Sequence, residues 1–223
     1  PEGPETIVSH TGTWKHGAIS LPLPVILGED GFEYRLANSR CKLLVVHADY
    51  LETIRDVYDA LDDLQHVVVL GDAELKYDFE HYFSAQTEPQ SVKSTPAATS
   101  PDDDALLVYT SGTTGDPKGV LHAHRLVLGM LPGFYMKFNI DVDGIYYTAI
   151  DWAWMGSLST LLPAFLTGQS VIAADYERFR PAEQLALLER YGVTHADFPP
   201  TALNMLRQED LSAYDLGLSM ILS

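Results

Sequence analysis

The chain has 223 residues, of which 46% are hydrophobic, enough to bury a sizeable core as one large domain or two small ones. Its 31 acidic residues against 14 basic ones give a formal net charge of −17, which excludes a nucleic-acid-binding protein because phosphates would be repelled. The single cysteine, Cys41, excludes an intrachain disulfide and favours a reducing cytoplasm, and the most apolar stretch, residues 158–174, is too interrupted by proline and glycine to span a membrane.

The acidic excess comes largely from 19 aspartates, while lysines number only 6. Such an Asp-rich, Lys-poor composition suits a salt-loving host, because molar salt shortens the Debye length to about 3 Å and screens the repulsion. We therefore expect a halophile as the source. An ordinary acidic cytosolic protein is the alternative.

Helical and strand patterns alternate along the first segment. A helix is predicted over residues 6–16, where Gly17 supplies the expected stop. The other elements expected here are a short strand at 18–23, a helix ending at 36–39, buried strands at 43–47 and 66–70, and a helix over 51–61. Near-continuous apolar runs are typical of strands covered on both faces, so the pattern predicts an α/β fold of layered helices on mainly parallel sheets.

A low-complexity stretch separates this segment from the next. Residues 86–104 hold three prolines, many small polar residues and the acidic run Asp102 to Asp104. The composition predicts a linker between an α/β segment over 1–85 and a second α/β segment over 105–223. Consecutive aspartates on an extended chain point alternately away from one another, so a solvated linker end is favoured over a metal site.

The second segment continues the alternation of strands and helices. The expected elements are a strand at 106–109, a helix from 122 to 131, a strand at 145–150, a helix at 158–166, a strand at 170–174, a helix at 181–190, a strand at 193–198 and a helix at 201–207. Pro181 suits a first helical turn, and Gly192 lies just past the end of the same helix.

Between the first strand and the first helix of this segment lies a run of hydroxyl-bearing residues and glycines ending in Pro117-Lys118-Gly119. Glycines let backbone N–H groups approach an anion, Ser and Thr hydroxyls donate hydrogen bonds, and lysine adds positive charge. The run therefore predicts a phosphate-binding loop, with a ligand-free surface turn as the alternative. A Walker loop is excluded, because its lysine follows glycine and precedes Ser or Thr.

The run from Tyr109 to Val120, Tyr-Thr-Ser-Gly-Thr-Thr-Gly-Asp-Pro-Lys-Gly-Val, resembles the signature of the adenylate-forming (AMP-binding) enzymes. That superfamily includes acyl-CoA synthetases, luciferases and peptide-synthetase adenylation domains. The resemblance implies that a carboxylate attacks Mg-ATP to give an acyl-adenylate and pyrophosphate, and that CoA then displaces AMP. A small-molecule carboxylate, ATP, Mg²⁺ and CoA are thus the expected substrates and cofactors.

The same resemblance implies roles for residues of the loop. Ser111, Thr113 and Thr114 are expected to contact the departing phosphates, and Lys118 is expected either to neutralise their charge or to steer closure of the loop. Thr114 and Lys118 are accordingly the expected catalytic residues. The full set expected to bind the nucleotide is Thr110, Ser111, Gly112, Thr113, Thr114, Gly115, Lys118 and Gly119.

Two further runs resemble elements of the superfamily, and the first of them resembles an element of the acetate and medium-chain branch of acyl-CoA synthetases, which would place the protein in fatty acid metabolism. Asp151-Trp152-Ala153-Trp154 resembles an Asp-x-Gly-Trp element, which implies that Trp152, Trp154 and Met155 border the acid. Core tryptophans with no ligand are the alternative.

The second of these runs is the turn at residues 194–203, which implies Pro200 and Thr201 as further substrate contacts. Capping of the next helix is by itself a sufficient reason for Thr201. No zinc site is expected, because His122 and His124 would point to different faces of a helix.

The resemblance covers only the middle of the family's large N-terminal domain, and the chain opens at Pro1. We therefore expect a fragment, a partial N-terminal domain that does not complete the reaction alone. Three functions stay open for the whole protein. They are an acyl-CoA synthetase, an amino-acid or aryl-acid adenylation domain that loads a carrier protein, and a noncatalytic nucleotide-binding module.

Overall fold

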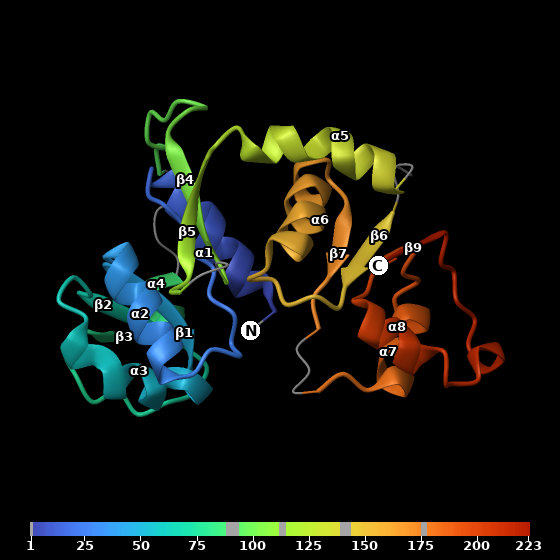
Figure 1. Cartoon of the computed structure of the whole chain (residues 1–223), viewed down its shortest axis with the longest axis horizontal. Helices are drawn as coiled ribbons and strands as arrows, with labels where there is room; N and C mark the ends of the chain where they lie inside the picture. The colour runs from blue at the N-terminus through green and yellow to red at the C-terminus, as the bar shows by residue number, and fades with distance from the viewer. Residues whose placement is uncertain (1, 88–93, 112–114, 139–143, 175–177) are drawn as a thin grey trace. The chain divides into compact units, whose positions relative to one another are not determined.

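The computed structural model describes residues 2–87, 94–111, 115–138, 144–174 and 178–223 (Figure 1). The chain divides into two compact units. Unit 1 comprises Ser9–Thr99 and Leu107–Leu121, and unit 2 comprises Glu2–Val8, Ser100–Leu106 and His122–Ser223.

The main sheet of unit 1 has three parallel strands in the order β1-β2-β3, which are Leu43–His47, His66–Leu70 and Glu80–Tyr82. Strand β2 lies between the other two and is buried from Val67 to Leu70, as predicted for the run at 66–70. The predicted strand at 43–47 is confirmed, but the prediction that it is buried on both faces is wrong. It is an edge strand whose one fully buried residue is Val46.

Two helices, α2 (Glu29–Ser39) and α3 (Leu51–Val57), pack on this sheet. The buried cluster contains Phe32 and Leu36 of α2, Leu51, Ile54 and Val57 of α3, and Val46, Val67 and Val69 of the strands. The apolar spacing predicted over 51–61 is confirmed, although the α-helix ends at Val57 and continues as the 3₁₀ turn η2 (Tyr58–Ala60). Two further short helices, η1 (Ala48–Tyr50) and α4 (Phe83–Thr87), complete the unit's helical turns.

Helix α1 (Pro4–Lys15) confirms the helix predicted over 6–16, and Gly17 follows it with a φ of 77°. The strand predicted at 18–23 is wrong. It is reduced to a single bridge at Ser20, whose carbonyl accepts a hydrogen bond from the Leu107 N–H at 2.9 Å. Pro22 and Pro24 have no N–H to donate, so a longer ladder cannot form here.

Strands β4 (Asp104–Thr110) and β5 (Lys118–Ala123) pair as a two-stranded sheet. Residues 111–117 are too few for a parallel crossover, so the pair is a hairpin. The strand predicted at 106–109 is confirmed, but the helix expected from 122 is wrong at its start, because α5 begins only at Leu126 and ends at Phe138. The predicted phosphate loop therefore joins two strands.

The sheet of unit 2 has four parallel strands in the order β7-β6-β8-β9, which are Ser170–Ile172, Ile145–Thr148, His195–Asp197 and Met220–Leu222. The helices that connect them are α6 (Met155–Leu166), α7 (Pro181–Arg190) and α8 (Pro200–Leu206), with the 3₁₀ turn η3 (Leu211–Ala213) before β9. The predicted elements from 145 to 207 are confirmed to within a few residues. Strand β9 was not predicted.

Strand order in unit 2 reverses between β6 and β8. The chain passes from β6 through α6 to β7 on one side, then returns through α7 to β8 on the other side. In open parallel sheets, ligands bind outside the carboxyl ends of the strands at such a switch point. Thr148 and Asp197 are paired there as the last residues of their strands. The α/β fold with mainly parallel sheets is thus confirmed, and none of the helices in the described residues is both long and apolar enough to cross a membrane.

Candidate functional site

The described residues of the predicted phosphate loop are exposed to solvent, except for the half-buried Pro117. Thr110 ends β4, Ser111 and Gly115 lie in the connection, and Lys118 begins β5, followed by Gly119. The other three predicted contacts, Gly112, Thr113 and Thr114, lie outside the described residues. The roles proposed for those three rest on the sequence.

A hydrogen bond joins the two strand ends at the mouth of the loop. The Thr110 hydroxyl donates to the Lys118 carbonyl at 3.4 Å. The bond uses the backbone of Lys118 and leaves its side chain exposed. A lysine amine at the mouth of an exposed loop is placed to attract a polyanion.

Glycine is favoured for different structural reasons at the two described glycine positions of the loop. Gly115 has a φ of 101°, and a Cβ added there would meet nothing within 4 Å, so backbone conformation alone favours glycine. At Gly119 the reason is packing, because a Cβ would lie 2.9 Å from Cδ1 of Leu107 on the paired strand. Gly119 therefore lets the two strands of the hairpin approach closely.

A second group of predicted residues follows β6 in unit 2. Asp151 forms a tight turn there, in which its Oδ1 accepts a hydrogen bond from the Ala153 N–H at 2.9 Å. The Ser157 hydroxyl of α6 donates to the carbonyl of Asp151 at 2.7 Å and lies 2.8 Å from that of Trp154. The turn that carries both tryptophans is therefore fixed by a buried serine at the start of α6.

The two tryptophans have different environments. Trp152 is 4% exposed, and its indole N–H has no hydrogen-bond partner among the described residues, whereas Trp154 is 49% exposed. Met155, the first residue of α6, is half-buried. A buried donor without a partner is costly in a folded protein, so the indole N–H of Trp152 is a buried polar atom that a ligand could satisfy.

Pro200 and Thr201 follow β8 and begin α8. The expectation that Thr201 caps this helix is wrong. The N-cap is Pro199, no side chain caps the helix, and Thr201 lies within the first turn. Both Pro200 and Thr201 are exposed, so their side chains are accessible at the β8 end of the sheet.

Asp197, the last residue of β8, was not singled out from the sequence. It is 7% exposed, and burial raises the pKa of its carboxyl, against the opposing effects of Lys137 and of the Thr160 hydroxyl 3.4 Å away. A carboxylate held in a costly environment at a switch point is a candidate functional group. An aspartate between Ala196 and Phe198, at the end of the strand predicted at 193–198, is the signal that could have identified it.

The structure thus places the predicted residues in two groups. The loop residues belong to unit 1, and Trp152, Trp154, Met155, Pro200 and Thr201 follow the neighbouring strands β6 and β8 of unit 2. The sheet of unit 2 brings these five residues, which were predicted to contact the acid, to one edge, although they are up to 49 positions apart in the chain.

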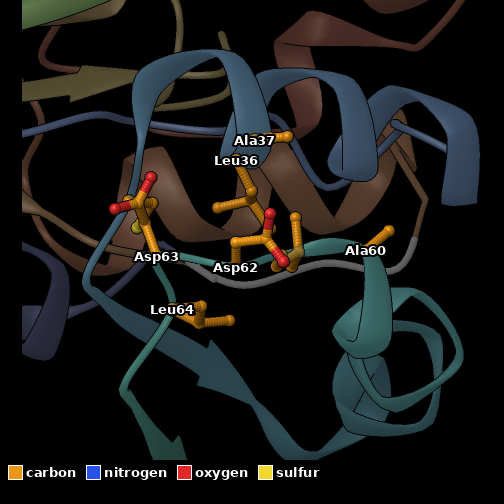
Figure 2. A pocket seen from close by; sticks show the side chains of 8 residues that line it. Leu36, Ala37, Ala60, Asp62, Asp63 and Leu64 are labelled. Carbon is orange, nitrogen blue, oxygen red and sulfur yellow. The ribbon is translucent and has the colours of Figure 1, made fainter.

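A small pocket in unit 1 contains none of the predicted site residues. It is lined by Leu36, Ala37, Cys41, Ala60, Leu61, Asp62, Asp63 and Leu64 (Figure 2). Burial raises the pKa of Cys41 to about 11, so its thiol stays protonated at neutral pH and is a poor nucleophile.

No cluster of three or more His, Cys, Asp or Glu side chains that could hold a metal ion occurs within the described ranges. His122 lies in β5 and His124 in the turn after it, not on the helix expected there. We assign no metal ligand among the described residues.

Known proteins were compared with the chain as a whole. The AMP-binding enzyme family matches residues 1–223. The chain is 32% identical to the acetyl-coenzyme A synthetase of Bacillus subtilis (strain 168) over 221 residues, which are 97% of this chain and 38% of that protein. It is 36% identical over 130 residues to a 3-hydroxybenzoate/4-hydroxybenzoate CoA ligase of Thauera aromatica, 57% of this chain and 24% of that protein.

Among solved structures, an anthranilate CoA ligase in complex with anthranoyl-AMP superposes with a TM-score of 0.91 at 25% identity, covering 99% of this chain and 43% of the other. The chain thus spans about two fifths of the length of that ligase and of the acetyl-coenzyme A synthetase. Since the family matches every residue from 1 to 223, the chain belongs to the AMP-binding enzyme family.

Proposed function

We propose that the protein carrying this chain is an AMP-forming acid–CoA ligase. The observation that carries the proposal is the family match over the whole chain, together with relatives that are CoA ligases for acetate and for hydroxybenzoate. In the proposed reaction a carboxylate oxygen attacks the α-phosphorus of ATP and pyrophosphate leaves. The thiol of CoA then displaces AMP from the acyl-adenylate and forms the thioester.

Loop residues 110–119 have the composition that the first step needs. Charge builds on the departing pyrophosphate, so catalysis depends on positioning and on donors aimed at its oxygens. We assign Ser111, Thr113 and Thr114 as hydroxyl donors and Lys118 as the neutralising cation. Ser111 and Lys118 are exposed at the loop, consistent with access to a ligand.

We assign the acid side to the edge where β6 and β8 end. Trp152, Trp154, Met155, Pro200 and Thr201 follow these strands. The preferred substrate is acetate or a short to medium-chain carboxylate, supported by the longer of the two curated matches. An aromatic acid is the second candidate, favoured by the hydroxybenzoate relative and by the anthranilate ligase structure.

Pyrophosphate exchange with the whole protein tests the proposal. Exchange of labelled pyrophosphate into ATP is expected with at least one acid from a panel of acetate, butyrate, octanoate, benzoate and 3-hydroxybenzoate, and AMP release is expected to require CoA. Exchange with an acid but no thioester with CoA would instead favour a carrier-loading adenylation domain. ATP binding without exchange for any acid would favour the noncatalytic module.

Two loop substitutions test the residue assignments. Thr114→Ala and Lys118→Ala should each slow exchange by about 10²-fold or more, the size seen when one donor to a developing charge is removed. Lys15→Ala, at an exposed lysine of α1, is the matched control and should leave the rate unchanged. Equal rates in all three variants would contradict the assignment.

A further inference from the structure

One face of helix α2 contacts both strand ends that flank the phosphate loop. The Tyr34 hydroxyl donates a hydrogen bond to the Pro117 carbonyl at 3.0 Å, across 83 positions of sequence. The Tyr109 hydroxyl donates to Oδ1 of Asn38 at 2.6 Å, across 71 positions. Since residues i and i+4 of a helix share a face, Tyr34 and Asn38 hold the two sides of one loop.

Ring and charge contacts reinforce the β4 side of the loop, where Tyr109 lies. Tyr34 meets the Tyr109 ring edge-on, with centroids 6.3 Å apart, and the Arg35 guanidinium lies 5.7 Å from the same ring. Burial, with the neighbouring Tyr34, raises the pKa of Tyr109 against the effect of Arg35. The Tyr109 hydroxyl thus stays protonated and able to donate to Asn38.

Helix α2 is a rigid support for these contacts. Phe32 and Leu36, on either side of Tyr34 in the sequence, are 6% and 2% exposed and belong to the buried cluster of unit 1. A helix anchored in this way cannot follow the loop if the loop shifts. Both contacts, the helix and the loop's strand ends lie within unit 1.

We propose that Tyr34 and Asn38 are positioning residues, which fix the two ends of the phosphate loop so that its N–H groups and Lys118 are preorganised for the triphosphate of ATP. The proposal rests on the phosphate-binding role proposed for the loop. The Tyr34 bond is the more direct of the two, because it fixes the peptide plane between Pro117 and Lys118. Without it that peptide is free to rotate, and binding must then order it at a cost in affinity.

Tyr34→Phe in the whole protein is the principal test, because it removes the hydroxyl and keeps the ring. The KM for ATP should rise about fivefold to tenfold, the size expected for one net hydrogen bond, while the KM for the acid stays unchanged. Tyr58→Phe is the matched control. The Tyr58 hydroxyl also donates to a backbone carbonyl of unit 1, that of Leu64, at the same distance of 3.0 Å. Its loss should lower stability similarly and leave both KM values unchanged.

Asn38→Ala and Tyr109→Phe test the other strand end as a double-mutant cycle. Because each removes one partner of the same hydrogen bond, the double variant should raise the KM for ATP no more than the larger single effect. If the double variant raised the KM for ATP by the product of the two single effects, the two side chains would act separately. That result would overturn the role of Asn38.

Hydrogen exchange of the amides at residues 110–118 supplies a readout that does not depend on activity. Tyr34→Phe should speed exchange there about fivefold or more relative to the native protein, and Tyr58→Phe should not. If the native protein showed no pyrophosphate exchange, the proposed function would fail. The hydrogen-exchange measurement would still test whether Tyr34 fixes the end of the loop. Unchanged amide exchange in Tyr34→Phe, or an unchanged KM for ATP beside faster amide exchange, would overturn the positioning role.

Discussion

His10 in α1 is a buried histidine, 7% exposed, whose Nδ1 hydrogen-bonds the Ser20 hydroxyl. Burial lowers its pKa from 6.5 to about 4. The folded state therefore resists a proton that the unfolded chain accepts, so the stability that neutral His10 provides is complete above pH 6.5 and is lost as the pH falls towards 4. From these two values the loss is about 2 kcal/mol at pH 5.

Denaturant unfolding at pH 7 and pH 5 measures this loss. His10→Gln should reduce the difference in unfolding free energy between the two pH values by about 2 kcal/mol relative to the native protein. His16→Gln, at the exposed position directly after the end of α1, should leave that difference unchanged. The same pH dependence in the native protein and in His10→Gln would show that other groups cause it.

At the element scale, the hairpin depends on one residue with a left-handed backbone. Gly115 has a φ of 101°, a region that side chains other than glycine rarely adopt. Gly115→Ala should therefore lower the unfolding free energy by about 1–2 kcal/mol, or distort the loop and raise the KM for ATP. Gly12→Ala, in the interior of α1 where a Cβ meets nothing within 4 Å, should have the opposite effect and stabilise by up to about 1 kcal/mol. If Gly115→Ala changed neither the unfolding free energy nor the KM for ATP, the predicted backbone strain at this position would be contradicted.

An ion pair between Arg55 and Glu80 ties α3 to β3. Glu80 is 4% exposed, and both of its oxygens accept hydrogen bonds from the Arg55 guanidinium at 2.6 Å. Burial opposes ionisation of Glu80, but these bonds and the Lys76 N–H outweigh it and hold its pKa below the ordinary value. The pair is thus stabilising above the ordinary pKa of a glutamate and is lost as the pH falls through the lowered one.

Glu80→Gln should destabilise the protein by about 3 kcal/mol at pH 7, because it removes the buried partner of a buried guanidinium and leaves only the exposed Glu52 to balance its charge. Glu52→Gln is the control. Its carboxylate accepts from the same Arg55 at 2.7 Å but is exposed, so its loss should cost much less. Thermal unfolding of the two variants side by side would show the difference, and equal destabilisation would mean that burial of Glu80 contributes nothing.

The sequence predicted elements wherever one local pattern dominated. The apolar run at 66–70 became β2, and Pro181 with Gly192 marked the ends of α7. Prediction from the sequence failed where pairing with residues distant in the chain determines the secondary structure. Strand β5 was missed because Lys118–Ala123 has no clear period of its own and becomes a strand by pairing with β4.

The residues of the candidate site likewise divide into those that a local pattern predicts and those that it does not. A phosphate loop could be predicted because the residue types that suit it are consecutive, from 110 to 119. Its contacts with α2 could not be predicted, since Tyr34 and Asn38 are 83 and 71 positions away from their partners. Asp197 was overlooked because its significance comes from burial at the end of β8, which no local pattern records.

On the scale of the whole molecule, the dominant feature is a net charge of −17 on 223 residues. Self-repulsion of this size opposes the compact state and also opposes the approach of the proposed substrates ATP and CoA, which are polyanions. Salt screens both effects, because the Debye length falls from about 10 Å at 0.1 M to about 3 Å at 1 M.

Stability should therefore increase with salt. We expect the midpoint of thermal unfolding to be higher in 1 M KCl than in 0.1 M KCl, and the KM for ATP to fall over the same range. Arg55 and Glu80 are largely sealed from solvent, so their attraction is screened much less than the surface repulsion. Glu80→Gln should consequently cost nearly the same in both salts, which separates surface repulsion from specific ion pairs. A midpoint that falls as KCl is raised would contradict adaptation to a saline environment, since the acidic surface would then contribute no net repulsion for salt to relieve.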